Sequence, residues 1–150
     1  MWLPAGNVLN SGTGFLNPVE ETTLTIPSTA TKVITVGAYD ARFDQAAAFS
    51  GRGYTRATNQ VKPDLVAPGV EIMSCAPGGG YQVRTGTSMA TPFVTGSAAL
   101  LMQWGIVNGN DAYLYGEKMK AYLIRGARRL PGFTAYPNPV LGDNGIIVSS

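Results

Sequence analysis

Ser88 is the residue of this sequence whose setting best suits nucleophilic chemistry. It lies in Gly86-Thr87-Ser88-Met89-Ala90, between a predicted strand and turn and an apolar segment that predicts a helix. A helix N-terminus offers unpaired N–H groups and the positive end of the helix dipole, so the Ser88 N–H could stabilise an oxyanion formed there. By position alone, a serine at the start of a helix is more typical of a cap.

The groups that usually activate a serine are absent or misplaced in these residues. The chain contains no histidine, so by itself it cannot hold a Ser-His-Asp triad. No lysine stands at Ser-x-x-Lys spacing from Ser88, which disfavours a Ser-Lys dyad, and solvated lysines are the ordinary case. Ala90 replaces the second glycine of Gly-x-Ser-x-Gly, so an esterase elbow is disfavoured as well. The lysines are Lys32, Lys62, Lys118 and Lys120.

The residue types present do not indicate a cysteine-based metal site or a phosphate-binding loop. Cys75 is the single cysteine, which rules out an internal disulfide and a multi-cysteine metal site. Its apolar strand context predicts a small core residue. Gly78-Gly79-Gly80 is not followed by Gly-Lys-Ser/Thr, so it predicts a turn and not a phosphate-binding loop.

The composition indicates one globular domain without a strongly charged surface. Of 150 residues, 45% are hydrophobic and 13% charged, against a usual charged share of roughly 25%. A net charge of +2 without a long basic run argues against nucleic acid and acidic membranes as partners. The longest apolar stretch, residues 96–107, is shorter than the roughly 20 residues of a membrane span and predicts a buried helix. Residues 1–4 predict no signal peptide.

Strands and helices are predicted around Ser88. Residues 32–38 are β-branched and apolar on both faces, as in a strand inside a sheet, and residues 70–76 and 81–85 predict a hairpin. A nearly all-apolar helix follows, starting either at Thr87 or at Pro92 with Thr91 as N-cap, and ending at Gly105. A second helix is predicted from Gly116 to Ala127, before an irregular tail.

These elements predict an α/β fold that forms only part of a domain. Two helices are too few to cover both faces of a parallel sheet, so several layers are expected to come from elsewhere. The chain by itself should then leave a strand edge and an apolar patch exposed, which favours a homo-oligomer of this fragment.

Five segments, in order, resemble the subtilisin-like serine proteases, the subtilase family. The resemblance covers residues 4 to about 104 and, more weakly, the second helix. The tail is also similar to subtilases of clostridia, including the spore-germination type. The matching segments are Pro4-Ala5-Gly6-Asn7, Val33 to Asp40, Ala48-Phe49-Ser50, Lys62 to Gly69 and Gly86 to Leu100.

The resemblance implies a role for each matching site residue. Ser88 is the nucleophile, and the Asn7 amide joins the Ser88 N–H in the oxyanion hole. Pro4, Ala5 and Gly6 form one wall of the pocket for the residue before the cut bond. The family's Asp and His motifs precede the Asn segment, so we expect residues 1–150 to be a partial catalytic domain that needs its N-terminal half.

The resemblance also implies the fold and the activity. The fold would be the C-terminal portion of a three-layer subtilisin-like domain, with a mainly parallel sheet, a hairpin before the serine and a central buried helix. The full protein would be a serine endopeptidase acting on peptides or proteins, in a secreted or spore-associated bacterial setting. Calcium is compatible with the family but is not indicated by these residues. Two alternatives stay open: an inactive pseudoprotease that only binds, and an assembly module.

Overall fold

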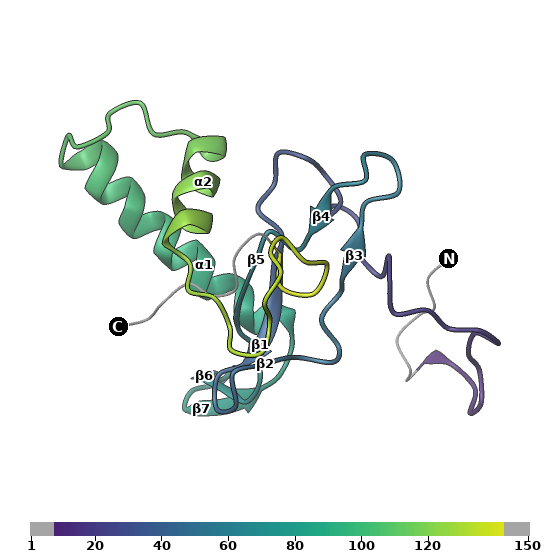
Figure 1. Cartoon of the computed structure of the whole chain (residues 1–150). Helices are drawn as coiled ribbons and strands as arrows, with labels where there is room; N and C mark the ends of the chain where they lie inside the picture. Colours follow the sequence, from purple (N-terminus) through teal and green to yellow (C-terminus); the bar gives the residue numbers. More distant parts are fainter. Residues whose placement is uncertain (1–7, 143–150) are drawn as a thin grey trace.

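The computed structural model describes residues 8–142, which form an α/β fold of three small sheets with the helices packed against the largest of them (Figure 1). Ser88 lies within this part of the chain. Pro4, Ala5, Gly6 and Asn7, predicted to form the pocket wall and the oxyanion hole, lie outside the described residues. Their roles therefore stay predictions.

The largest sheet is built around β1 (Val36–Asp40). β1 pairs in parallel with β5 (Leu65–Pro68) on one side and antiparallel with β2 (Gln45–Ala46) on the other. The predicted parallel pairing is thus present between the two longer strands. The short antiparallel strand β2 makes the sheet mixed.

The first strand is shorter than the sequence predicts. The β-branched pattern extends back to Lys32, but the strand begins at Val36. Just before it, the Thr35 N–H donates to a carboxylate oxygen of Asp64 at 2.7 Å. This side-chain contact takes the place of a ladder bond from a neighbouring strand, so regular pairing starts one residue later.

Two antiparallel hairpins complete the strands. β3 (Gly53–Tyr54) pairs with β4 (Val61–Lys62), and β6 (Ile72–Cys75) pairs with β7 (Tyr81–Arg84). The second hairpin confirms the one predicted just before Ser88.

Cys75 is exposed, so the prediction that it is a core residue is wrong. Among the described residues, β6 and β7 pair only with each other, and most of their side chains are exposed. An apolar strand becomes buried only where a second layer covers it. No such layer lies over this part of the hairpin in residues 8–142.

The helices follow the hairpin. α1 (Thr87–Met102) begins at Thr87, which is the first of the two predicted starts, and holds Pro92 inside it. The chain continues as the π-helix η2 (Gln103–Val107). α2 (Gly116–Gly126) confirms the second predicted helix to within a residue.

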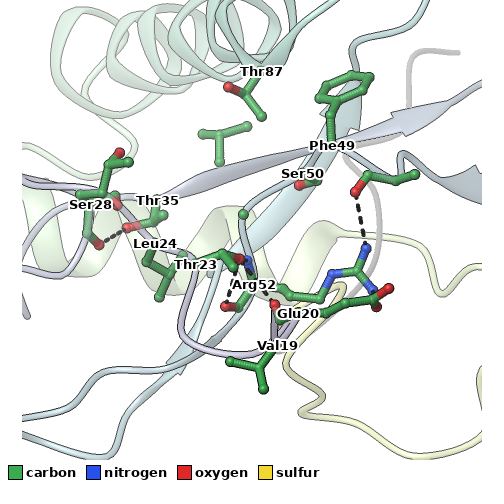
Figure 2. A pocket seen from close by; sticks show the side chains of 14 residues that line it. Val19, Glu20, Thr23, Leu24, Ser28, Thr35, Phe49, Ser50, Arg52 and Thr87 are labelled. Carbon is green, nitrogen blue, oxygen red and sulfur yellow. Dashed lines mark hydrogen bonds and ion pairs between the residues drawn. The ribbon is translucent and has the colours of Figure 1, made fainter. Parts of the chain in front are cut away.

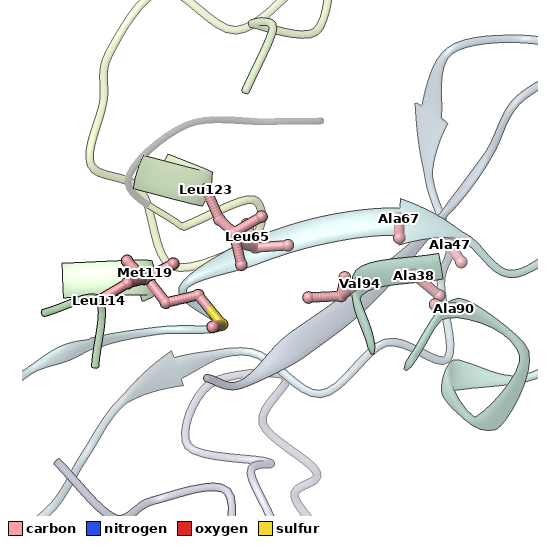
Figure 3. Packing of buried hydrophobic residues seen from close by; sticks show 9 residues of the cluster. All are labelled: Ala38, Ala47, Leu65, Ala67, Ala90, Val94, Leu114, Met119 and Leu123. Carbon is pink, nitrogen blue, oxygen red and sulfur yellow. The ribbon is translucent and has the colours of Figure 1, made fainter. Parts of the chain in front are cut away.

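The core lies on both faces of the β1–β5 pair. Side chains alternate along a strand, so neighbours face opposite sides of the sheet. Ala38, Leu65 and Ala67 pack with residues of the two α-helices, including Ala90, Val94, Met119 and Leu123 (Figure 3). Tyr39 and Val66 pack on the other face against Leu130 and Leu141 of the irregular tail. Helices, sheet and tail therefore form three layers.

α1 lies centrally against the sheet but is not buried all round. It contacts β1 and β5, while Ala90 and Val94 are its buried residues. Leu100 is 67% exposed and Val107 at the end of η2 is 77% exposed, so the helix is only partly covered in residues 8–142. The segment Thr87–Val107 is also long and apolar enough to cross a membrane by length and composition alone, a property that it shares with core helices.

We expect the isolated chain to self-associate through this apolar helix. Exposed apolar area favours association because burial removes it from water. The weight-average mass from sedimentation should rise with protein concentration, and Leu100→Glu should shift the distribution toward monomer. Tyr113→Glu is the matched control, because Tyr113 is 88% exposed in the loop before α2. A monomer at every concentration would contradict this expectation, as would equal effects of both variants.

Candidate active site

Ser88 lies in the first turn of α1 with its side chain exposed. The N-cap of the helix is Gly86, and no side chain caps it. The alternative that Ser88 serves as the cap is therefore wrong. No acidic residue occupies the first turn, so the partial positive charge of the helix end faces the serine without a fixed carboxylate to neutralise it.

The start of α1 is held by a backbone junction with the end of β5. The Gly86 N–H donates to the Gly69 carbonyl at 2.8 Å, and the Gly69 N–H donates to the Tyr39 carbonyl at 3.0 Å. Gly69 is buried. These bonds connect the central strand to the residue two positions before Ser88, so the sheet positions the candidate nucleophile.

Side-chain contacts at the base of the β6–β7 hairpin stabilise the same junction. The Glu71 N–H donates to the Thr85 hydroxyl at 2.9 Å. Arg42 donates to Asp40 at the end of β1 and also pairs with Glu71, so it bridges the strand and the hairpin. The hydrogen bond from Arg42 lowers the pKa of Asp40, which keeps that carboxylate charged at neutral pH.

Gly69→Ala should destabilise the fold. A Cβ at Gly69 would lie 2.6 Å from the Ala38 Cβ and 3.0 Å from the Gly86 carbonyl oxygen, and both neighbours belong to the packed junction. Overpacking of this kind costs about 1–3 kcal/mol. Chemical denaturation should show the loss, whereas Gly96→Ala in α1 should cost nothing, since no atom outside its own stretch of helix lies within 4 Å of the added Cβ. Equal stabilities of Gly69→Ala and the unmodified chain would contradict the clash.

A pocket of about 480 Å³ opens beside the serine turn, and Thr87 is part of its lining (Figure 2). Leu24 and Phe49 give it apolar surface, while Ser28 and Thr35 contribute hydroxyls. Glu20 and Arg52 also line it, and their charged groups lie 3.3 Å apart. The mixed lining can receive a side chain that is partly apolar and partly polar.

The lysines of the chain all pair with carboxylates away from Ser88. Lys32 pairs with Glu117 at 3.6 Å and Lys118 with Asp111 at 2.6 Å. The two remaining lysines, Lys62 and Lys120, share Asp64. This arrangement agrees with the expectation that no Ser-Lys dyad forms.

Lys62 corrects the expectation that the lysines are solvated. Its side chain is 1% exposed and its Nζ lies 2.7 Å from Asp64 Oδ2. Burial lowers the pKa of Lys62, and the bond to Asp64 opposes that shift. The only sequence signal was a charged pair, Lys62 and Asp64, placed directly before the apolar strand β5.

The described residues offer no obvious metal centre. Between Val8 and Gly142, no three His, Cys, Asp or Glu side chains are grouped so that they could hold a metal ion.

Comparison with known sequences now identifies the class of protein. The sequence model of the subtilase family, Peptidase_S8, matches residues 4–143. The chain therefore belongs to the subtilase family.

Individual relatives agree with this assignment. The intracellular serine protease of Paenibacillus polymyxa is 46% identical over 77 residues, which cover 51% of this chain and 21% of that protein. The serine protease AprX of Bacillus subtilis (strain 168) is 38% identical over 119 residues, covering 66% of this chain and 26% of AprX. The chain thus spans about a quarter or less of the length of these curated relatives.

The solved structures support both the fold and the clostridial similarity. The CspB protease of Clostridium perfringens superimposes with a TM-score of 0.86 at 50% identity, over 91% of this chain and 29% of that one. A cold-adapted subtilisin-like serine proteinase gives a TM-score of 0.60 at 28% identity, over 83% of this chain and 39% of that one. The subtilisin-like α/β fold and the likeness to clostridial subtilases are confirmed.

Proposed function

We propose that this chain supplies the nucleophile and the oxyanion hole of a serine endopeptidase. The observation that carries the proposal is the position of Ser88. It is exposed in the first turn of an uncapped helix, within a chain that matches the subtilase family over residues 4–143. The general base and its orienting carboxylate would come from polypeptide outside these 150 residues, since the chain has no histidine.

The chemistry would proceed through an acyl-enzyme. The Ser88 hydroxyl oxygen attacks the carbonyl carbon of the peptide bond while the base takes the hydroxyl proton. The Ser88 N–H and the Asn7 side-chain amide donate to the oxygen that becomes negative. The base then gives its proton to the leaving amine as the C–N bond breaks. Water then attacks the ester carbon while the base takes a proton from it, and the base gives that proton to the Ser88 oxygen as the acid product leaves.

The substrate class that fits is a peptide or a protein. The pocket that Thr87 lines lies beside the candidate nucleophile and offers both apolar and polar surface to a substrate side chain. Pro4, Ala5 and Gly6 are proposed to form a further wall of the substrate site. Small residues there would leave room for a sizeable side chain.

The test uses a longer protein that contains this chain together with an upstream histidine. A fluorophosphonate reagent, which phosphonylates an activated serine, should add one group to Ser88 and stop hydrolysis of a peptide substrate. The Ser88→Ala variant should take up no reagent and cleave no substrate. An unlabelled Ser88 in the folded longer protein would contradict the proposal and favour a pseudoprotease or an assembly module instead.

A further inference from the structure

Asp64 is clamped between two lysines inside the fold. Its Oδ2 lies 2.7 Å from Lys62 Nζ and its Oδ1 lies 2.6 Å from Lys120 Nζ. The side chains of Lys62 and Asp64 are 1% and 4% exposed, and that of Lys120 is 18% exposed. Lys62 ends β4, Asp64 directly precedes β5 and Lys120 belongs to α2, so the cluster joins two strands to this helix.

The lysine ammonium groups of this cluster also donate hydrogen bonds to backbone carbonyls. Both lysine ammonium groups donate to the Val33 carbonyl, Lys62 at 3.3 Å and Lys120 at 3.2 Å. Lys120 also donates to the Thr31 carbonyl at 3.4 Å. A buried ion pair is stable only when such additional bonds compensate the loss of water. The segment before β1 is therefore held from two sides.

Asp64 connects this cluster to the pocket beside Ser88. Its Oδ2 accepts the Thr35 N–H at 2.7 Å, and the Thr35 hydroxyl donates to the Ser28 carbonyl at 2.6 Å. Figure 2 shows this second bond at the wall of the pocket, which Thr35 and Ser28 both line. A continuous series of polar contacts therefore runs from α2 to the pocket wall.

We propose that Lys120 is a positioning residue for the substrate pocket. Through Asp64 it holds Thr35 and Ser28 in the conformation that receives a substrate side chain. The proposal rests on the proposed endopeptidase function, because it assigns the pocket to that substrate. Lys120 is far along the chain from Ser88 and acts on substrate binding, not on the bond-breaking step.

The first test is kinetic and uses the longer, active protease. Lys120→Gln removes the ammonium group that pairs with Asp64 Oδ1 but leaves Lys62 paired with Oδ2. The buried carboxylate therefore keeps one cationic partner, and the fold is retained. KM should rise about tenfold with kcat nearly unchanged, since a less ordered wall weakens binding in the ground and transition states alike. Lys120→Arg should restore most of the affinity.

The matched control is Lys118→Gln. Lys118 lies on the same helix, carries the same charge and pairs with Asp111 at 2.6 Å, which does not line the pocket. It should leave KM unchanged. Equal KM values for the two glutamine variants would overturn the proposal. A loss of kcat at Lys120→Gln with KM unchanged would overturn it too.

The second test needs no activity and uses the 150-residue chain itself. The Thr35 amide hydrogen should exchange with solvent about tenfold faster in Lys120→Gln than in Lys118→Gln, because its acceptor is less well held. Equal exchange at Thr35 in both variants would overturn the positioning role. If the longer protein cleaves no peptide but Thr35 responds as expected, the proposed function fails and the link from Lys120 to the pocket wall stands.

Discussion

The purified 150-residue chain is expected to hydrolyse peptides about 10⁶-fold more slowly than a longer protein that supplies the base. The expectation follows from the absent histidine. Loss of the base from a Ser-His-Asp site costs about 10⁶ in kcat, a value obtained on subtilisin itself. The oxyanion donors would remain, but a neutral serine hydroxyl is a weak nucleophile without a group to take its proton.

The measurement is turnover of a fluorogenic peptide by the chain and by its Ser88→Ala variant. Both should give the same rate as buffer within error, because each of the four lysines pairs with a carboxylate and none is left as a base for Ser88. Turnover by the unmodified chain that disappears in Ser88→Ala would show that another group serves as base. The assignment of the base to residues outside the chain would then be wrong.

Asn7→Ala in the longer protease should lower kcat by about 10² to 10³. The corresponding loss of transition-state stabilisation is about 2.7–4 kcal/mol, again a value known from subtilisin and not one derived from this chain. The physical reason is that the amide donates to an oxygen that carries negative charge only in the transition state. KM should therefore change little.

The control for this variant is Asn10→Ala. Asn10 is the same residue type three positions further along the sequence, and it is exposed. It should keep the kcat of the unmodified protease. A kcat for Asn7→Ala equal to that of Asn10→Ala would show that Asn7 is only a turn residue. A raised KM with unchanged kcat would place it in substrate binding instead of the oxyanion hole.

Much of the local structure around Ser88 could be predicted because hairpins and amphipathic helices are specified by residues close together in the sequence. Turn glycines between two short β-branched runs specify a hairpin, and the spacing of Met119 and Leu123 specifies an amphipathic helix. For the start of α1 the sequence allows two alternatives, since Pro92 suits the first turn of one helix and is tolerated early in the other. The structure decides for Thr87, where the chain leaves the junction with Gly69.

The environment of single side chains could not be predicted from the same patterns. Cys75 has an apolar neighbourhood in sequence but no covering layer in the described fold, so it is exposed. Lys62 has a charged side chain but is buried, because the Asp64 carboxylate and the Val33 carbonyl receive its ammonium group. Burial depends on which distant segments pack together, and that information is not local.

The family motifs, the order of hairpin and helix, and the residue assigned to nucleophilic chemistry all follow from local patterns in the amino-acid sequence. The hydrogen bonds of Gly69 to the serine turn and to β1, and the contact of Lys120 with Asp64 across more than fifty residues of chain, exist only in the folded molecule. The physical reason is the range of the interactions. Turn chemistry and hydrophobic periodicity act over a few residues, whereas close packing and buried charge pairs exist only once remote segments meet.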